Sequence, residues 1–228
     1  MRTCVLALAA LVAASPAHAG KAYNWSGIYF GAHVGGAWGD AVTRDDIADF
    51  AFDVDGVFGG GTAGINLQFG SIVLGPEIDI GYLDLSGGRR TDSSNPTKFQ
   101  TLDIEGGSYV LLGGRAGMAF GETLLYGKGG WVWYGTDSTQ TTTNPGYVTN
   151  GTGSFDGWAL GGGLEQALGG GWSLKAEYMH FGFGAEQGDQ TSVSDPPIGH
   201  VYEFTTDLDA ETVKLGINYN FSYALSNP

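Results

Sequence analysis

Apolar and polar residues alternate one by one along several segments of this chain, and this alternation constrains the fold more than any other feature. Between residues 213 and 221, one set of alternate positions holds Val213, Leu215, Ile217, Tyr219 and Phe221, and the other holds Lys214, Gly216, Asn218 and Asn220. A β-strand sends successive side chains to opposite faces. The segment therefore predicts a strand with one apolar and one polar face.

Eight segments show this alternation in a strong or weaker form: 27–35, 55–69, 74–82, 102–119, 124–135, 155–168, 172–179 and 213–221. Three short connections centre on Gly70, Gly121 and residues 169–171, whereas four long ones cover about 40–54, 86–101, 136–154 and 184–208. Short and long connections alternate in the same way in outer-membrane barrels. The sequence therefore predicts an all-β fold, an eight-stranded antiparallel up-and-down transmembrane β-barrel with short periplasmic turns and four long extracellular loops.

The composition agrees with a membrane barrel. Charged residues make up 15% of the chain, against ~25% in typical soluble domains. Inside a bilayer every backbone amide must pair within the protein, which helices and closed barrels achieve. After the N-terminus no apolar segment is long enough for a membrane helix, so a closed barrel is expected. The net charge of −14 argues against nucleic acid as a partner.

The N-terminus has the pattern of a secretory signal peptide. Arg2 supplies a positive charge, an apolar run follows, and Ala17-His18-Ala19 places small residues at the positions that signal peptidase reads. We expect residues 1–19 to be removed, which leaves a barrel domain over 20–228 with a short C-terminal tail, 222–228. The single cysteine, Cys4, lies in the signal. The mature chain is therefore expected to have no disulfide and no thiolate metal site.

The predicted polar faces carry charged side chains of both signs. This inward-facing set comprises Glu77, Asp79, Glu105, Arg115, Lys128, Glu165, Lys175, Glu177 and Lys214. Side chains can just fill the interior of an eight-stranded barrel, and an unpaired buried charge is costly. We therefore expect a salt-bridged network that fills the barrel, with an open ion path as the alternative.

The six tryptophans all lie near predicted strand ends, except for Trp131, which lies further into its strand. They are Trp25, Trp38, Trp131, Trp133, Trp158 and Trp172. Indole rings favour the boundary between lipid and water. We expect them to form interfacial belts, with ordinary packing on the sheet as the alternative.

Several segments resemble the small porin-family outer-membrane proteins, which are eight-stranded surface antigens related to the transmembrane domain of outer membrane protein A. The resemblance rests on residues 25–31, 157–168, 171–178 and 212–221 and covers most of residues 23–221. It implies a place in the outer membrane of a Gram-negative bacterium, among outer-membrane lipid and lipopolysaccharide. It also implies a role in envelope integrity and in surface interaction.

The same resemblance implies that periplasmic chaperones and the barrel-assembly machinery handle the chain. The machinery would read the alternating last strand, namely Val213, Leu215, Ile217, Tyr219 and Phe221. Members of the family usually end at the final aromatic residue, whereas here residues 222–228 follow Phe221. The position or the efficiency of this signal is therefore open.

The resemblance leaves three alternatives to a structural surface protein. These are a small-solute channel, a protein that binds haemin or a host ligand through its loops, and a lipid-modifying enzyme. Catalysis needs a nucleophile beside an oriented base, and His33, His180 and His200 stand in no such pattern. The sequence contains no phosphate-binding or ordered cation-binding motif. We therefore expect no enzyme, no cofactor and no metal.

Overall fold

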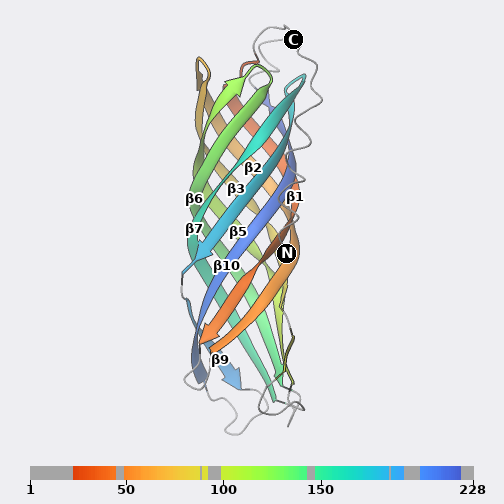
Figure 1. Ribbon diagram of the computed structural model, residues 1–228, viewed down its shortest axis with the longest axis vertical. Helices are drawn as coiled ribbons and strands as arrows, with labels where there is room; N and C mark the ends of the chain where they lie inside the picture. The colour runs from red at the N-terminus through yellow and green to blue at the C-terminus, as the bar shows by residue number, and fades with distance from the viewer. Residues whose placement is uncertain are drawn as a thin grey trace.

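The computed structural model of this chain is a closed antiparallel β-barrel (Figure 1). It describes residues 23–44, 49–87, 89–91, 99–142, 147–184, 186–192 and 201–221, and within them the side chains of 23–40, 54–84, 106–135, 154–184 and 208–221. The strands are β1 (Gly27–Arg44), β2 (Asp49–Phe69), β3 (Ile72–Gly87), β4 (Arg89–Thr91), β5 (Phe99–Phe120), β6 (Thr123–Thr142), β7 (Tyr147–Gly169), β8 (Trp172–Phe183), β9 (Glu186–Ser192) and β10 (Val201–Asn220).

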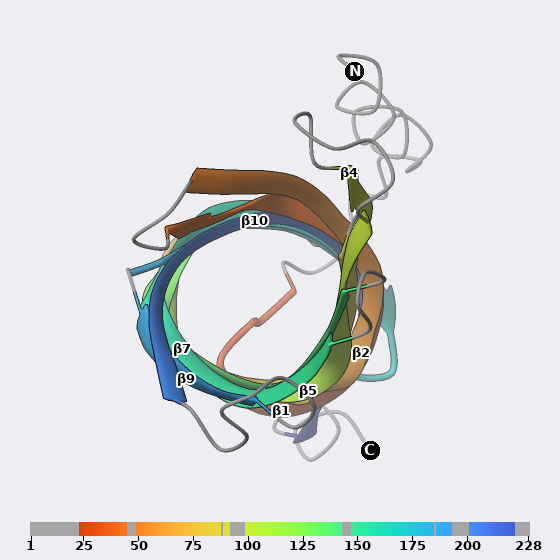
Figure 2. The same cartoon turned by 90° about the horizontal axis from the view of Figure 1, so that it is seen from below.

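The ten strand segments form the eight strands of the barrel, which confirms the predicted number. Each strand pairs with its neighbour, and β10 returns to pair antiparallel with β1, which closes the sheet (Figure 2). The two short strands continue longer ones. Strand β4 pairs with β5 beyond the end of β3, and β9 pairs with β10 beyond the end of β8. Closure matters because a membrane barrel can leave no unpaired edge in lipid.

Three tight turns at one end of the barrel connect β2 to β3, β5 to β6 and β7 to β8. Gly70, Gly121 and the run Gly169–Gly171 have φ between 61° and 90°, a left-handed backbone that favours glycine. These are the glycines at which the sequence predicts the short connections. By the rule for outer-membrane barrels, this end is periplasmic. It is the upper end in Figure 1.

At the other end the strands continue well into the segments predicted as long loops. The β1–β2 ladder runs to Arg44 opposite Asp49, and the β6–β7 ladder runs to Thr142 opposite Tyr147. The predicted bounds 40–54, 86–101, 136–154 and 184–208 were therefore too wide. Threonine-rich segments pair well in sheets. Outside the bilayer both faces of a strand can be polar, so the alternation that marks a strand is lost.

The outward face of the barrel is apolar over a band that ends in acidic residues. On β1 this face runs from Ile28 to Trp38, and the next outward residue is Asp40. At ~3.4 Å per residue and ~40° of tilt, that distance rises ~26 Å, close to the ~25 Å apolar band of outer-membrane barrels. Outward acids end the band on other strands as well, namely Asp55, Asp84, Asp156, Asp209 and Glu211. These carboxylates mark the extracellular edge of the bilayer.

The chain before β1 enters the periplasmic mouth of the barrel. Figure 2 shows this start of the chain, in red, crossing the opening. Trp25 is 2% exposed and packs edge-on against Tyr23, with ring centroids 4.8 Å apart. The prediction of an interfacial Trp25 was therefore wrong, since residue 25 precedes the strand and its ring turns inward. The other five tryptophans lie on the outer face, with 40–48% of each side chain exposed.

No helix among the described residues is long and apolar enough to cross a membrane.

Candidate functional site

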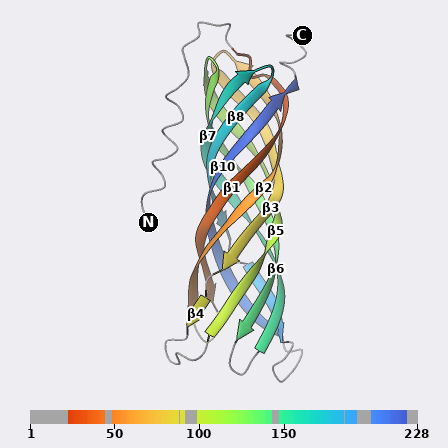
Figure 3. The same cartoon turned by 90° about the vertical axis from the view of Figure 1, so that its right-hand side faces the viewer.

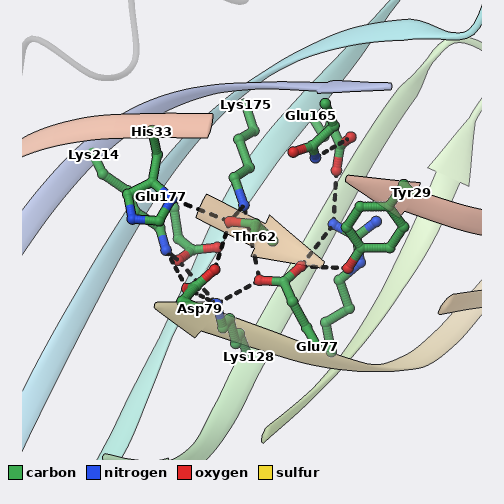
Figure 4. Close-up of polar contacts among 12 residues, drawn as sticks. Tyr29, His33, Thr62, Glu77, Asp79, Lys128, Glu165, Lys175, Glu177 and Lys214 are labelled. Carbon is green, nitrogen blue, oxygen red and sulfur yellow. Dashed lines mark hydrogen bonds and ion pairs between the residues drawn. The ribbon is translucent and has the colours of Figure 1, made fainter. Parts of the chain in front are cut away.

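The middle of the barrel interior holds a layer of charged side chains (Figure 4). Eight of the nine residues predicted for this network meet there, each at most 3% exposed, and we call them the charged layer: Glu77 and Asp79 from β3, Arg115 from β5, Lys128 from β6, Glu165 from β7, Lys175 and Glu177 from β8, and Lys214 from β10. The ninth, Glu105, lies outside the described side chains. Strand alternation brings these residues inward, because each occupies the face opposite the lipid.

Asp79 forms the first centre of the charged layer, with three short contacts. Its Oδ2 atom accepts from the ammonium groups of Lys128 at 2.5 Å and Lys214 at 2.6 Å. Its Oδ1 atom accepts a hydrogen bond from the Thr62 hydroxyl at 2.5 Å. Two cations from two different strands therefore share one carboxylate, which ties β3 to β6 and β10.

Glu77 forms the second centre. Its Oε1 lies 2.5 Å from the Lys128 ammonium, and its Oε2 accepts the Tyr29 hydroxyl at 2.5 Å. The guanidinium of Arg115 lies 3.5 Å from the same Oε2, and Lys175 is more distant at 3.8 Å from Oε1. Each oxygen of Glu77 thus has a short partner, as burial of a carboxylate requires.

Arg115 and Glu165 form a third group nearer the periplasmic end. Arg115 donates to Glu165 at 2.7 Å and, through Nε, to the Asn66 amide oxygen at 2.9 Å. The guanidinium also lies 4.4 Å from the centre of the Tyr29 ring. The other oxygen of Glu165 accepts from Ser173 at 2.5 Å and from Asn218 at 2.8 Å. Both ions are therefore held by several neighbours.

Glu177 completes the balance of charge. It pairs with Lys214 at 2.7 Å and accepts the Tyr126 hydroxyl at 2.7 Å. The charged layer thus contains four carboxylates and four cations. Equal numbers of acids and bases leave the layer with no net charge, so it offers no unpaired charge to a passing ion.

His33 links the charged layer to the aromatic residues on its extracellular side. Its Nδ1 lies 3.1 Å from the Thr62 hydroxyl oxygen, and its Nε2 lies 2.6 Å from the Tyr109 hydroxyl. Thr62 has one hydroxyl hydrogen and gives it to Asp79. The Nδ1 atom must therefore be the donor to Thr62, and a neutral ring then accepts from Tyr109 through Nε2. Both nitrogens are occupied, so His33 is a satisfied interior residue.

A second layer, toward the extracellular end, is apolar. This outer apolar layer comprises Ala37, Val54, Phe58, Leu83, Tyr109, Leu111, Val132, Tyr134, Ala159, Met179, Phe181, Phe183, Leu208 and Ala210. Its rings contact one another, as with Phe181 and Phe183, whose centroids are 6.1 Å apart. A void of about 10 Å³ remains, lined by Phe58, Leu83, Tyr109, Val132, Phe181, Phe183 and Thr212. That space holds at most one water molecule.

A third layer closes the periplasmic end. This inner apolar layer comprises Tyr23, Trp25, Val73, Leu124, Tyr126 and Ala167. The segment before β1 is held in place by polar contacts. The Trp25 amide donates to the Gln68 side chain at 2.7 Å, and the Asn220 amide group donates to the Trp25 carbonyl at 3.2 Å. The charged layer is therefore covered by apolar side chains at both ends.

The predicted assembly residues lie on the lipid-facing side of the closing strand. Val213, Leu215, Ile217, Tyr219 and Phe221 alternate outward along β10 and just past its end, as the sequence predicts. Phe221 contacts Phe30 of β1 across the closing seam, with centroids 5.6 Å apart, and it contacts Tyr219 at 4.9 Å. Phe221 thus packs where the first and last strands meet.

Sequence reasoning missed the neutral members of the network and the apolar layers. Tyr29, Thr62 and Tyr126 all bond to carboxylates of the charged layer. Their inward position was readable from the alternation, but their partners come from strands far away in the sequence. Phe181 and Phe183 lie beyond the predicted strand 172–179, so the alternation did not assign their faces, whereas β8 runs to Phe183.

The sequence and fold of this barrel are similar to those of known outer-membrane proteins. The chain matches the outer membrane protein beta-barrel domain over residues 5–221. It is 27% identical over 216 residues to the 31 kDa outer-membrane immunogenic protein of Brucella melitensis, a match that covers 87% of this chain and 85% of that protein. The protein of the same name from Brucella suis matches equally well.

Among solved structures, the barrel is similar to the outer membrane protease OmpT from Escherichia coli. The TM-score is 0.55 at 8% sequence identity, and the match covers 86% of this chain and 97% of that one. A major outer membrane protein from Thermus thermophilus matches with a TM-score of 0.47 at 12% identity, over 82% of this chain and 99% of that one. At such low identities the likeness concerns the fold alone.

Proposed function

This chain belongs to the outer membrane protein beta-barrel domain family, and we propose that it is a non-enzymatic surface barrel that supports envelope integrity and carries surface-exposed contacts. It is an outer-membrane protein. The observation that carries the proposal is the filled interior, in which a balanced charged layer lies between two apolar layers. An interior of this kind stabilises a wall and leaves no route through it.

The interior argues against the channel alternative. A solute moving along the barrel axis would have to displace Trp25 at one end and the Phe181 and Phe183 rings at the other. Between them it would separate ion pairs such as Lys128 with Asp79. Breaking a buried ion pair by removing one partner costs ~3–5 kcal/mol. We therefore favour a closed barrel over a porin-like one.

Two observations support contacts at the cell surface. Strand β7 has 23 residues, which at ~3.4 Å per residue and ~40° of tilt would rise roughly 60 Å. The apolar band needs less than half of that height, so the wall would project beyond the bilayer. In addition, the Brucella relative is named an immunogenic outer-membrane protein. We propose that this projecting part and its loops make any contact with host or surface ligands, haemin included.

The described histidines argue against catalysis. His33 has both nitrogens bonded to Thr62 and Tyr109 inside the sealed barrel. His180 pairs with Glu211 on the outer wall, where its described partners are that carboxylate and the Trp158 ring. The two hydroxyls that contact His33 are sealed inside the barrel away from any substrate, and the described contacts of His180 include no hydroxyl. We therefore propose a barrel that binds and supports but does not catalyse.

A deletion strain tests the proposal. Loss of the protein is expected to increase killing by detergent and to remove the binding of antibodies raised against the folded barrel to intact cells. Complementation with the wild-type gene should restore both. A strain whose detergent sensitivity and surface binding are unchanged by the deletion would contradict the proposal.

A matched control separates export from assembly. We propose that the assembly machinery reads the outward aromatic residues of the last strand, so Phe221→Ser should yield exported but poorly assembled protein. This variant should complement less well than the wild type. Ile217→Leu, which keeps an apolar outward side chain on the same strand, should complement fully.

A further inference from the structure

The segment before β1 lies inside the barrel but does not belong to its wall. Tyr23, Asn24, Trp25 and Ser26 precede the first strand, and we call these four residues the N-terminal plug. In the described sheet none of the strand pairings includes them, and the barrel closes between β1 and β10 without them. Two of the four nevertheless belong to the inner apolar layer. The plug is therefore a separate element placed in the mouth of a complete wall.

The apolar site of Trp25 is assembled from strands on different sides of the barrel. In the inner apolar layer, Val73 comes from β3, Leu124 from β6 and Ala167 from β7. Strand β3 is separated from β7 by β5 and β6 along the sheet. Side chains from both strands therefore join one cluster only across the interior of a closed barrel. It follows that the plug can dock only after the sheet has closed.

Polar contacts attach the plug to the two strands that flank β1. Toward β2, the Trp25 backbone amide donates to the Gln68 side chain at 2.7 Å, and the Gln68 backbone amide donates to the Ser26 hydroxyl at 3.1 Å. Toward β10, the Asn220 side chain donates to the carbonyls of Trp25 at 3.2 Å and Ser26 at 3.4 Å. Strands β10, β1 and β2 run side by side in Figure 3. The plug thus spans the closing seam on its inner side.

The docked plug leaves one polar group unsatisfied. The Trp25 side chain is buried, and its ring N–H has no acceptor among the described residues. A buried donor without an acceptor lowers the stability of the docked state. The same N–H would bond to water once the ring left the mouth of the barrel. The plug is therefore held less firmly than the wall, where the backbone groups pair along continuous ladders.

We propose that the N-terminal plug is a periplasmic lid, which docks after the barrel closes and can leave without unfolding the wall. When the plug is out, water and small ions from the periplasm reach the nearest part of the charged layer, where Glu165 contacts Arg115 and Ser173. The outer apolar layer stays in place, because the plug contributes none of its residues. Opening therefore creates a chamber with a single mouth and not a channel.

Thiol labelling of the folded barrel in mild detergent tests the proposal. The only cysteine, Cys4, lies in the predicted signal, so mature protein with Ser173→Cys has a single thiol. Ser173 is 3% exposed, and with the plug intact the thiol should react slowly with a maleimide. Adding Trp25→Ala should speed the reaction at least about tenfold, because the ring that fills the mouth is lost. The variant should still run as the folded band on an unheated gel.

Two controls locate the effect. Trp172→Ala removes an indole at the same end of the barrel, but this one is 46% exposed on the outer wall. It should leave the labelling of Ser173→Cys unchanged. Thr212→Cys places a thiol beside the void in the outer apolar layer, and Trp25→Ala should leave that thiol as slow to react as before. Fast labelling at this second position would contradict a lid that leaves without unfolding the wall.

A milder variant keeps the test decisive if Trp25→Ala fails to fold. Gln68→Ala removes the acceptor of the Trp25 amide near the end of β2. It should speed the labelling of Ser173→Cys about threefold, as expected for the loss of one hydrogen bond. Unchanged labelling in a folded plug variant would overturn the proposal, as would equally fast labelling with the plug intact. None of these outcomes depends on the proposed surface contacts.

Discussion

The charged layer and the outer apolar layer occupy the same barrel and are equally buried, yet they are held together in different ways. Asp79 and Lys128 are held by a few short, directional contacts, and each contact has a specific partner. Leu111 and Phe183 are held by many weak contacts that depend on shape. The first layer therefore depends on pairing, and the second depends on volume.

This difference indicates what each layer does. A pairwise network fixes the relative positions of strands that are distant in sequence, since residues of β3, β6 and β10 must meet at one carboxylate. An apolar layer excludes water but tolerates exchanges of similar volume. The charged layer thus specifies the arrangement, and the apolar layers keep it dry, which in turn strengthens its ion pairs.

The largest effect is expected from Asp79→Asn, which keeps the shape but removes one charge. Lys128 and Lys214 would then share a neutral amide in a buried site, and the barrel should lose ~3–5 kcal/mol of unfolding free energy. The shift from the folded to the unfolded band on a gel, followed against urea or temperature, measures this loss. An unchanged midpoint would mean that the charged layer does not depend on pairing.

Leu111→Ala tests the outer apolar layer by removing volume and no charge. The expected loss is ~3 kcal/mol, from lost burial and from the cavity that remains. Leu111→Met is the control, and it should cost less than ~1.5 kcal/mol because it nearly conserves volume. If both variants were equally destabilised, the layer would depend on specific contacts as the charged layer does.

Removing a matched pair should cost less than removing one partner. Asp79→Asn with Lys214→Met restores equal numbers of acids and bases, and Lys128 keeps Glu77. The double variant should be more stable than Asp79→Asn alone by ~1–3 kcal/mol in a double-mutant cycle. Additive losses would show that the two charges do not act as a pair.

The smallest effect is expected from Tyr29→Phe. The hydroxyl that donates to Glu77 is lost, but Lys128 still holds that carboxylate and the ring still covers Arg115. A loss of ~1 kcal/mol is expected, typical of one hydrogen bond with other partners present. A loss as large as that of Asp79→Asn would mean that the neutral members carry the network. Equilibrium unfolding in urea resolves this difference.

Much of the wall was predictable from the sequence, because a barrel strand has a period of two residues. Lys214 and Leu215 could be assigned to opposite faces without any knowledge of their neighbours. The glycine turns were equally clear, since a left-handed backbone at Gly70 and Gly121 limits the choice of residue.

The partners inside the barrel could not be predicted. Lys214 and Asp79 are 135 residues apart in the sequence, and their meeting depends on the tilt and register of the closed sheet. The inward position of Trp25 could not be predicted because Trp25 precedes the first strand, where alternation gives no information. The extension of the strands beyond the bilayer could not be predicted because both faces of a strand can be polar in water.

Planar bilayer recording with the purified, folded barrel tests the central claim most directly. The sealed, charge-balanced interior predicts no conductance steps from the folded wild type. Stepwise, reproducible conductance from the folded wild type would contradict the account, because ions would then cross layers that the structure fills with Trp25, Asp79 and Phe183.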